Sequence, residues 1–272
     1  MSRSRAKFAS NAMGIWTRKW GWALGLICAL PACDQSTQAD LQASDVLQIK
    51  LCPDRSGTSC TGVADGETPV RVSICTPVQA DRVSALSVEA TLSSGSFRAI
   101  GAGTPQTATF SLARNPCADL QLVPSRKPLP IEIVARFDAY RTQAFLPVAA
   151  ATLSSIEVSA QPLVLQSTTS TTVTLSAVVR TSGIGEPSEG TVVRFEVIDV
   201  QPAGIPVSVL PDRRRISYDS AAGSVATSQL YVGSKATQVT VRVTAVPPLV
   251  EGDGLPPSPP SISQTVTLPA IQ

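Results

Sequence analysis

The stretch Ser170-Thr-Thr-Val-Thr-Leu-Ser-Ala-Val-Val-Arg180 decides the fold class. Its apolar residues fall at every second position, and mostly polar residues stand between them. In an extended strand this spacing makes one face apolar and the other mostly polar. Such alternation is typical of an antiparallel sheet that buries one face. The positions on the predicted buried face are Val173, Leu175, Ala177 and Val179.

The same alternation recurs along the chain on both sides of this stretch, and no segment after Cys33 shows a convincing helical period. The other apolar sets are Val70, Val72 and Ile74; Leu86, Val88, Ala90 and Leu92; Ile131, Ile133, Ala135 and Phe137; Val193, Phe195 and Val197; and Val239, Val241 and Val243. Turn-forming residues separate these sets, for example Asp65-Gly66, Ser94-Gly95, Asn115-Pro116, 183–187, Ala203-Gly204 and 252–260. Short strands between frequent turns predict an all-β protein built from β-sandwiches.

The predicted strands are too many for one sandwich of about 100 residues, and the chain contains an internal repeat. Residues 131–147 and 239–269 each predict a closing pair of strands that ends in Leu-Pro. We therefore expect two tandem immunoglobulin-like β-sandwiches, the first over residues 45–150 and the second over residues 151–272. The length of 272 residues allows each of them to bury its own core.

The N-terminal residues have the pattern of an export signal. Arg18 and Lys19 precede the apolar run 20–30, which has the length of a signal-peptide core and is shorter than the ~20 apolar residues that span a bilayer. Residues 13–32 alone would form a signal of ordinary length, so both Met1 and Met13 are candidate start positions.

The apolar run ends in Leu30-Pro31-Ala32-Cys33, which resembles the lipobox of bacterial lipoproteins. That resemblance implies that the Cys33 thiol is acylated, that residues 1–32 are removed as a signal peptide, and that the new amino terminus is acylated as well. The polar residues 33–44 would then form a flexible tether, and three acyl chains would hold the chain stably at a membrane. Pro31 departs from the Ser or Ala that is usual at its position.

Two alternatives accompany the lipobox. The leader could be an ordinary cleaved signal, or an uncleaved anchor helix, with Cys33 incidental to either. Asp34 resembles the inner-membrane retention signal of enteric bacteria, although other bacterial groups sort differently. The expected location is therefore the bacterial cell envelope, with the choice between outer and inner membrane left open.

Four cysteines remain once those of the leader and the lipobox are set aside. An even number in an exported chain predicts disulfides, and four cysteines allow three pairings. We favour Cys52 with Cys60, across a segment whose Pro and Gly predict a turn, and Cys75 with Cys117, between distant strands. A zinc site is the competing interpretation, but the spacings are wide and the chain has no histidine.

Four segments of the second half resemble the bacterial Ig-like (group 1) repeats of intimin and invasin. The resemblance covers roughly residues 153–272, and it implies an Ig-like fold and a role in cell-envelope adhesion or assembly. It carries no catalytic residue to this chain. A weaker match covers residues 66–74, residues 88–96 and the closing strand pair of the first half. The four segments are 170–180, Gly190-Thr-Val-Val-Arg-Phe-Glu-Val197, Gly223-Ser-Val-Ala-Thr-Ser-Gln-Leu230 and Ala236-Thr-Gln-Val-Thr-Val-Arg-Val-Thr-Ala245.

The absence of histidine excludes Ser-His-Asp and Cys-His catalysis and histidine-based metal sites. No nucleophile elbow and no glycine-rich phosphate loop occurs. The carboxylate pairs Asp65 with Glu67 and Glu251 with Asp253 stand beside glycines, and we interpret them as solvated turn residues, with a weak calcium site as the alternative. The sequence thus predicts a protein that is not an enzyme and has no cofactor and no metal.

Charge gives no general reason to expect binding of nucleic acid. The formal charge is +2, but without the five basic residues of positions 1–33 the chain has 17 basic residues and 20 acidic ones. The one concentrated basic run is Arg213-Arg-Arg215, which predicts an exposed sheet edge that resists pairing with other strands. Contact with an anionic lipid or a polyanion is the alternative.

Together these features predict a lipid-anchored cell-envelope lipoprotein that acts as a non-catalytic binding or spacer module. The family resemblance favours adhesion. The expected partners are a membrane, through the acyl chains on Cys33, and a protein or glycan that the sequence does not identify. The alternative function is that of an accessory subunit in a periplasmic or secretion-system complex.

Overall fold

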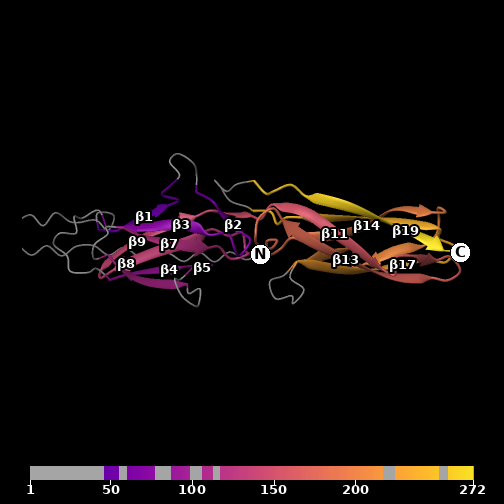
Figure 1. Cartoon of the computed structure of the whole chain (residues 1–272), viewed down its shortest axis with the longest axis horizontal. Helices are drawn as coiled ribbons and strands as arrows, with labels where there is room; N and C mark the ends of the chain where they lie inside the picture. The colour runs from indigo at the N-terminus through magenta and orange to yellow at the C-terminus, as the bar shows by residue number, and fades with distance from the viewer. Residues whose placement is uncertain are drawn as a thin grey trace, which may run out of the picture. The chain divides into compact units, whose positions relative to one another are not determined.

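The structure is a computed structural model, and it describes residues 46–54, 60–76, 87–98, 106–112, 117–216, 224–250 and 257–271 (Figure 1). These residues belong to one compact unit. From Gln48 onward, strands make up all of the regular structure in the described ranges. The predicted signal peptide 1–32 with Leu30, Pro31 and Ala32, the tether 33–44 with Cys33, and the pair Glu251 and Asp253 lie outside the described residues.

The strands between residues 48 and 150 form two antiparallel four-stranded sheets and one parallel pair. The first sheet has the order β1 (Gln48–Leu51), β3 (Val70–Cys75), β7 (Cys117–Val123) and β5 (Ser96–Phe97). The second has the order β6 (Thr107–Ser111), β4 (Ser87–Leu92), β8 (Ile131–Phe137) and β9 (Tyr140–Leu146). The parallel pair joins β2 (Gly62–Ala64) to β10 (Val148–Ala150).

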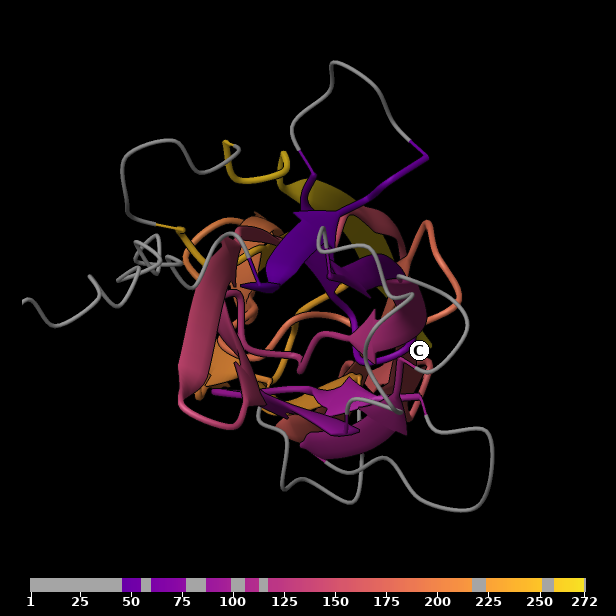
Figure 2. The ribbon, with the colours of Figure 1, turned by 90° about the vertical axis from the view of Figure 1, so that its left-hand side faces the viewer.

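One hydrophobic core lies between these sheets, whose strands stand on opposite sides of it in Figure 2. Alternate residues of β3 and β8 enter this core, as the sequence predicts, because successive side chains of a strand point to opposite faces. Buried members of the core include Val70, Val72, Ile74, Ile131, Ile133 and Ala135.

The strands between residues 153 and 271 form two further sheets. The first has the order β11 (Leu153–Gln161), β13 (Thr171–Thr181), β17 (Val225–Val232) and β15 (Val207–Leu210). The second has the order β12 (Leu165–Gln166), β19 (Ile262–Ile271), β18 (Gln238–Val246), β14 (Val192–Gln201) and β16 (Arg213–Arg215).

A second hydrophobic core lies between these two sheets. Strand β13 supplies Val173, Leu175, Ala177 and Val179 to this core, and each of these side chains is at most 1 % exposed. Facing residues come from the other predicted sets, at Val193, Phe195, Val239, Val241 and Val243. The all-β fold class predicted from the alternation is therefore confirmed.

Both predicted closing pairs form antiparallel hairpins, β8 with β9 and β18 with β19. The first hairpin is followed by β10, a strand that the sequence analysis did not predict. Residues 148–150 read Val-Ala-Ala, which is too short to show an alternation, and their strand conformation depends on pairing with the distant β2.

The structure contains the disulfides Cys52–Cys60 and Cys75–Cys117. Cys75 and Cys117 occupy opposed positions on the paired strands β3 and β7, so their disulfide links two strands of one sheet. Both bridges lie in the half of the chain that carries the first core.

Candidate functional site

The described residues contain no group of three or more Cys, Asp or Glu side chains placed to hold a metal ion. In the same part of the chain, no helix has the length and apolar character that crossing a membrane requires. Four features are candidate sites: an ionic cluster on β3 and β7, a buried polar contact, a cavity beside that contact, and an arginine-rich sheet edge.

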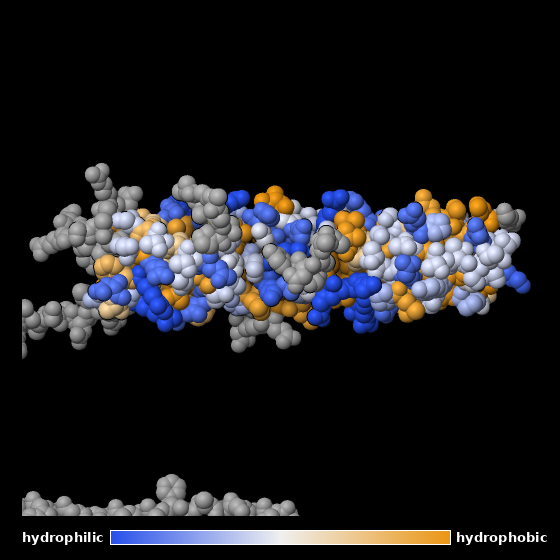
Figure 3. All heavy atoms as spheres, turned by 90° about the horizontal axis from the view of Figure 1, so that it is seen from below, coloured by the Kyte–Doolittle hydropathy of each residue, from blue (hydrophilic) through white to orange (hydrophobic). Residues whose placement is uncertain are grey.

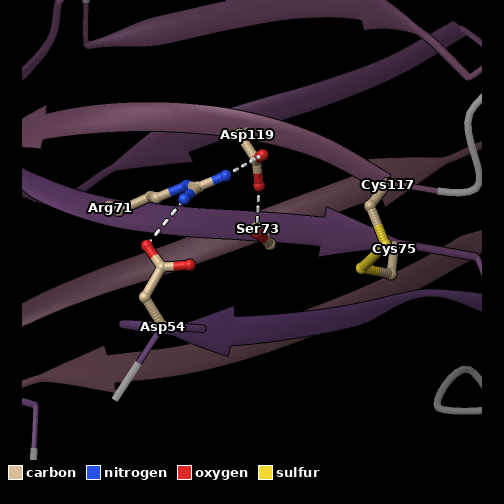
Figure 4. Close-up of polar contacts among 6 residues, drawn as sticks. All are labelled: Asp54, Arg71, Ser73, Cys75, Cys117 and Asp119. Atoms are coloured by element: carbon tan, nitrogen blue, oxygen red, sulfur yellow. Dashed lines mark hydrogen bonds and ion pairs between the residues drawn. A yellow bond between two sulfur atoms is a disulfide. The ribbon is translucent and has the colours of Figure 1, made fainter.

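The ionic cluster surrounds Arg71, which projects from β3 between two carboxylates (Figure 4). Its guanidinium donates from Nη1 to Asp54 at 2.6 Å and from Nη2 to Asp119 at 2.5 Å. The Ser73 hydroxyl donates to the other carboxylate oxygen of Asp119. These contacts link residue 54 to strands β3 and β7 close to the Cys75–Cys117 disulfide.

Hydrogen bonds are the main cause of the pKa shifts of Arg71 and Asp119 in this cluster. The Ser73 hydroxyl, followed by the Arg71 guanidinium, lowers the pKa of Asp119 below its ordinary value. The two carboxylates raise the pKa of Arg71, Asp119 more than Asp54. About half of the Arg71 and Asp119 side chains is exposed, so water screens these charges. The directions of both shifts favour the charged forms of Arg71 and Asp119, which gives this pair a structural role rather than an acid–base one.

The buried contact is made by residues 182–191, between β13 and β14, against residues of the first half. Arg126 is 7 % exposed, and its Nε and Nη2 donate to the carbonyl oxygen of Pro187 at 3.0 and 2.8 Å. Its Nη1 lies 2.6 Å from a carboxylate oxygen of Glu186. The guanidinium is thus buried with its charge paired and its hydrogen bonds made, as a buried charge requires.

Ser188 is fully buried in the same contact. Its hydroxyl donates to the carbonyl oxygen of Ala64 at 2.7 Å and accepts from the backbone N–H of Ala151 at 2.8 Å. One side chain therefore pairs a backbone group of the last residue of β2 with one of the residue that follows β10. Sequence analysis missed both Ser188 and Arg126, because neither belongs to a periodic pattern.

Asp65 also lies in this contact, and its predicted role as a solvated turn residue is wrong. It is 3 % exposed, and its carboxylate accepts from the backbone N–H groups of Glu67 and Thr68 and from the Thr68 hydroxyl, at 2.5–2.9 Å. Gly185 packs directly on it, since a Cβ at Gly185 would lie 2.5 Å from the Asp65 carbonyl oxygen. The carboxylate closes a turn while the distant segment covers it. Glu67 is exposed, as predicted.

An open cavity of about 710 Å³ adjoins the contact, and its lining includes Glu67, Arg98, Gln106 and Ser125. Its volume falls within the range of small-molecule sites, roughly 300–1,000 Å³. Within the described residues, Ser125 Oγ is the one buried side-chain oxygen without a hydrogen-bond partner, but protein atoms cover it and it offers no donor to the cavity.

The arginine run forms β16, which among the described strands pairs with β14 alone and is the edge strand of its sheet. All three arginines are exposed, which confirms the predicted charged edge. Exposed large apolar side chains among the described residues include Leu163, Ile184, Leu210 and Leu249. On the face drawn in Figure 3, hydrophobic residues are interspersed with hydrophilic ones.

Two layers of mostly antiparallel strands pack around each core, which places the chain in the β-sandwich class of proteins. No family model matches the sequence, and no curated protein matches it. Among solved structures, the chain is similar to invasin, a bacterial integrin-binding protein, with a TM-score of 0.50 and 16% sequence identity over 80% of this chain and 38% of that chain. The fold-level resemblance to Ig-like domains of the intimin and invasin type is therefore confirmed.

Two further adhesin structures are similar at lower scores. The adhesin InvE of Yersinia pseudotuberculosis gives a TM-score of 0.47 at 12% identity, over 84% of this chain and 59% of that chain. The D0-D1 domain of intimin gives 0.29 at 13% identity, over 79% of this chain and 96% of that chain. This chain spans less than two thirds of the invasin and InvE structures.

Proposed function

We propose that the chain is a lipid-anchored cell-envelope lipoprotein that acts as a non-catalytic spacer or binding module in adhesion. The observation that carries the proposal is the buried polar contact of residues 182–191 with Asp65, Arg126 and Ala151. A spacer must hold its parts in a fixed relative position. A buried contact whose hydrogen bonds are all paired holds them, because partly breaking it would leave buried polar groups without hydrogen-bond partners, which costs free energy.

The domain organisation is part of this proposal. We propose that residues 45–150 and 151–272 are two tandem sandwiches, since the first core ends at Val148 and the second begins at Leu153. Only Ala151 and Thr152 lie between β10 and β11. A link of two residues, combined with the hydrogen bonds of Ser188 and Arg126, leaves little freedom for hinge motion.

The fold supports the adhesive part of the proposal by analogy alone. Invasin, the solved structure with a TM-score of 0.50, is an integrin-binding bacterial protein. The absence of histidine supports a role other than catalysis. The partner class is a protein or glycan outside the membrane.

Lipid labelling tests the anchor. Cells that express the full chain are fed alkyne-tagged palmitate, and the purified protein is examined for the label. We expect labelling of the wild type, loss of labelling in Cys33→Ser, and full labelling in Cys28→Ser, whose cysteine belongs to the predicted leader. Label that persists in Cys33→Ser, or is absent from the wild type, contradicts the anchor and leaves the fold unaffected.

Protease treatment separates adhesion from the alternative role as an accessory subunit of a periplasmic or secretion-system complex. Intact cells and osmotically shocked cells are treated with a protease, and the protein is followed by immunoblotting. An adhesin on the surface is cleaved in both samples. Cleavage only after osmotic shock would place the protein in the periplasm and overturn the adhesive role.

A further inference from the structure

Three arginines gather on the outer face of the sheet that ends in β16. Arg194 of β14 lies directly opposite Arg213 of β16, and Arg215 lies opposite Val192. Val193 and Phe195 are buried, so Arg194 points outward, and the residues opposite positions 192 and 194 point outward with it. Arg214 points to the other side, where its Nε donates to the carbonyl oxygen of Thr227 on β17. We call Arg194, Arg213 and Arg215 the arginine triad.

Protection of the sheet edge explains only part of this arrangement. Charged residues on β16 discourage pairing with another strand, but Arg194 belongs to β14, which has a strand on each side. Like charges at directly opposed positions destabilise a sheet. The pair Arg194–Arg213 therefore adds repulsion without adding to edge protection.

Few carboxylates among the described residues offset this charge. Asp212 lies 3.8 Å from Arg213, and Glu196 is paired with Arg242 at 3.9 Å. Within the described ranges, no carboxylate lies within 4.0 Å of the Arg194 or Arg215 guanidinium. Counted over the described residues, the triad therefore has more positive than negative charge around it, which a bound anion would offset.

We propose that the arginine triad binds a phosphoryl group, carried by a phospholipid headgroup or by free phosphate. Guanidinium groups donate paired hydrogen bonds that match the oxygens of a phosphate. Opposed residues have Cα atoms about 5 Å apart, and alternate residues of a strand are about 7 Å apart, so the three long side chains can reach one such group together. Asp212 and Glu196 flank the triad and interrupt any longer basic track. This proposal does not depend on the lipid anchor or the spacer role.

Titration of the full-length chain in a neutral maltoside detergent tests the proposal. The arginine Nε–H signals are followed by nuclear magnetic resonance while one of three probes is added. The probes are inorganic phosphate, dihexanoyl phosphatidylglycerol below its micelle concentration, and dihexanoylglycerol, which has the same chains without a phosphate. We expect saturable shifts at Arg194 and Arg215 with a phosphate-bearing probe and none with dihexanoylglycerol.

Variants connect the shifts to the triad. Loss of charge-assisted hydrogen bonds should raise the dissociation constant of Arg194→Gln combined with Arg215→Gln by about tenfold or more. The matched control is Arg180→Gln, an exposed arginine on the other sheet that is paired with Glu157, and it should bind as the wild type does. Thermal unfolding of each variant verifies that it is folded.

The probes also identify the source of the phosphoryl group. Binding of phosphatidylglycerol without binding of inorganic phosphate supports a phospholipid, and equal binding of both supports a free phosphate. The proposal is overturned if neither probe binds, or if binding survives the double substitution.

Discussion

Arg194 and Arg213 lie directly opposite each other on the antiparallel strands β14 and β16, and both side chains are exposed. Because like charges at opposed positions destabilise a sheet, Arg194→Thr should raise the free energy of unfolding by roughly 0.2–1 kcal/mol. Urea denaturation at low ionic strength measures the change, and added salt should reduce it. The control Arg180→Thr removes a favourable pair with Glu157 and should not stabilise. If Arg194→Thr leaves the free energy of unfolding unchanged or lowers it, the opposed arginines do not destabilise the sheet.

Arg126→Met should destabilise the protein by about 1.5–3 kcal/mol, because the Pro187 carbonyl oxygen loses two charge-assisted donors in a buried place. The effect is measured by urea denaturation, together with hydrogen exchange at the backbone N–H of Glu186, which donates to the Asp65 carbonyl oxygen. The control is Lys127→Met, because the exposed Lys127 side chain lies 3.9 Å from Glu189 in a surface ion pair. This substitution should lower the free energy of unfolding by less than about 1 kcal/mol. Equal effects of the two substitutions would contradict the importance of the buried contact.

The two disulfides should differ in their contributions to stability. They close loops with sequence separations of 8 and 42 residues. Loop-closure entropy gives about 2.6 kcal/mol for Cys52–Cys60 and about 4 kcal/mol for Cys75–Cys117. Denaturation of the paired Cys→Ala variants measures both values in the oxidised protein. A larger loss from removing the short loop would contradict the entropic account.

Protonation of Asp119 should account for part of the loss in the protein's free energy of unfolding at acid pH. Its pKa is lowered in the folded protein, so the charged carboxylate stabilises the fold above the ordinary aspartate pKa of 3.8, and this contribution is lost as the pH falls through and below that value. Asp119→Asn should therefore be less stable than the wild type at pH 7 and should lose less stability between pH 6 and pH 3. Denaturant titrations at several pH values measure the difference.

Ser73→Ala tests the physical cause of that shift. The Ser73 hydroxyl contributes most to the lowered pKa of Asp119, so its removal should bring the pKa back toward the ordinary value. Carboxylate signals followed by nuclear magnetic resonance report the titration directly. An unchanged pKa in Ser73→Ala would assign the shift to Arg71 alone.

The fold could be predicted from the sequence because its strands bury one face at a time. The alternation at Val173 to Val179 and at Val239 to Val243 appears unchanged in the second core. The charge of residues 213–215 also allowed their edge position to be predicted, because three consecutive arginines are unsuited to an interior strand.

The buried polar contact could not be predicted in the same way. Ser188 and Ala64 are 124 residues apart, and Arg126 and Pro187 are 61 residues apart, so no local period relates them. Asp65 carried a correct turn signal, but its burial depends on the approach of Gly185 from a distant segment. The register between β14 and β16, which places Arg194 opposite Arg213, is likewise a property of the assembled sheet.

The Cys75–Cys117 disulfide also has a mechanical consequence. A pulling force applied through the two ends of the folded chain passes from β3 to β7 across the sulfur atoms, and the intervening segment carries no load. Since the bridge spans 42 residues, unfolding under tension would release roughly 140 Å less chain than the reduced protein would. The oxidised protein is therefore the less extensible of the two forms, and a reducing environment would lengthen its reach under load.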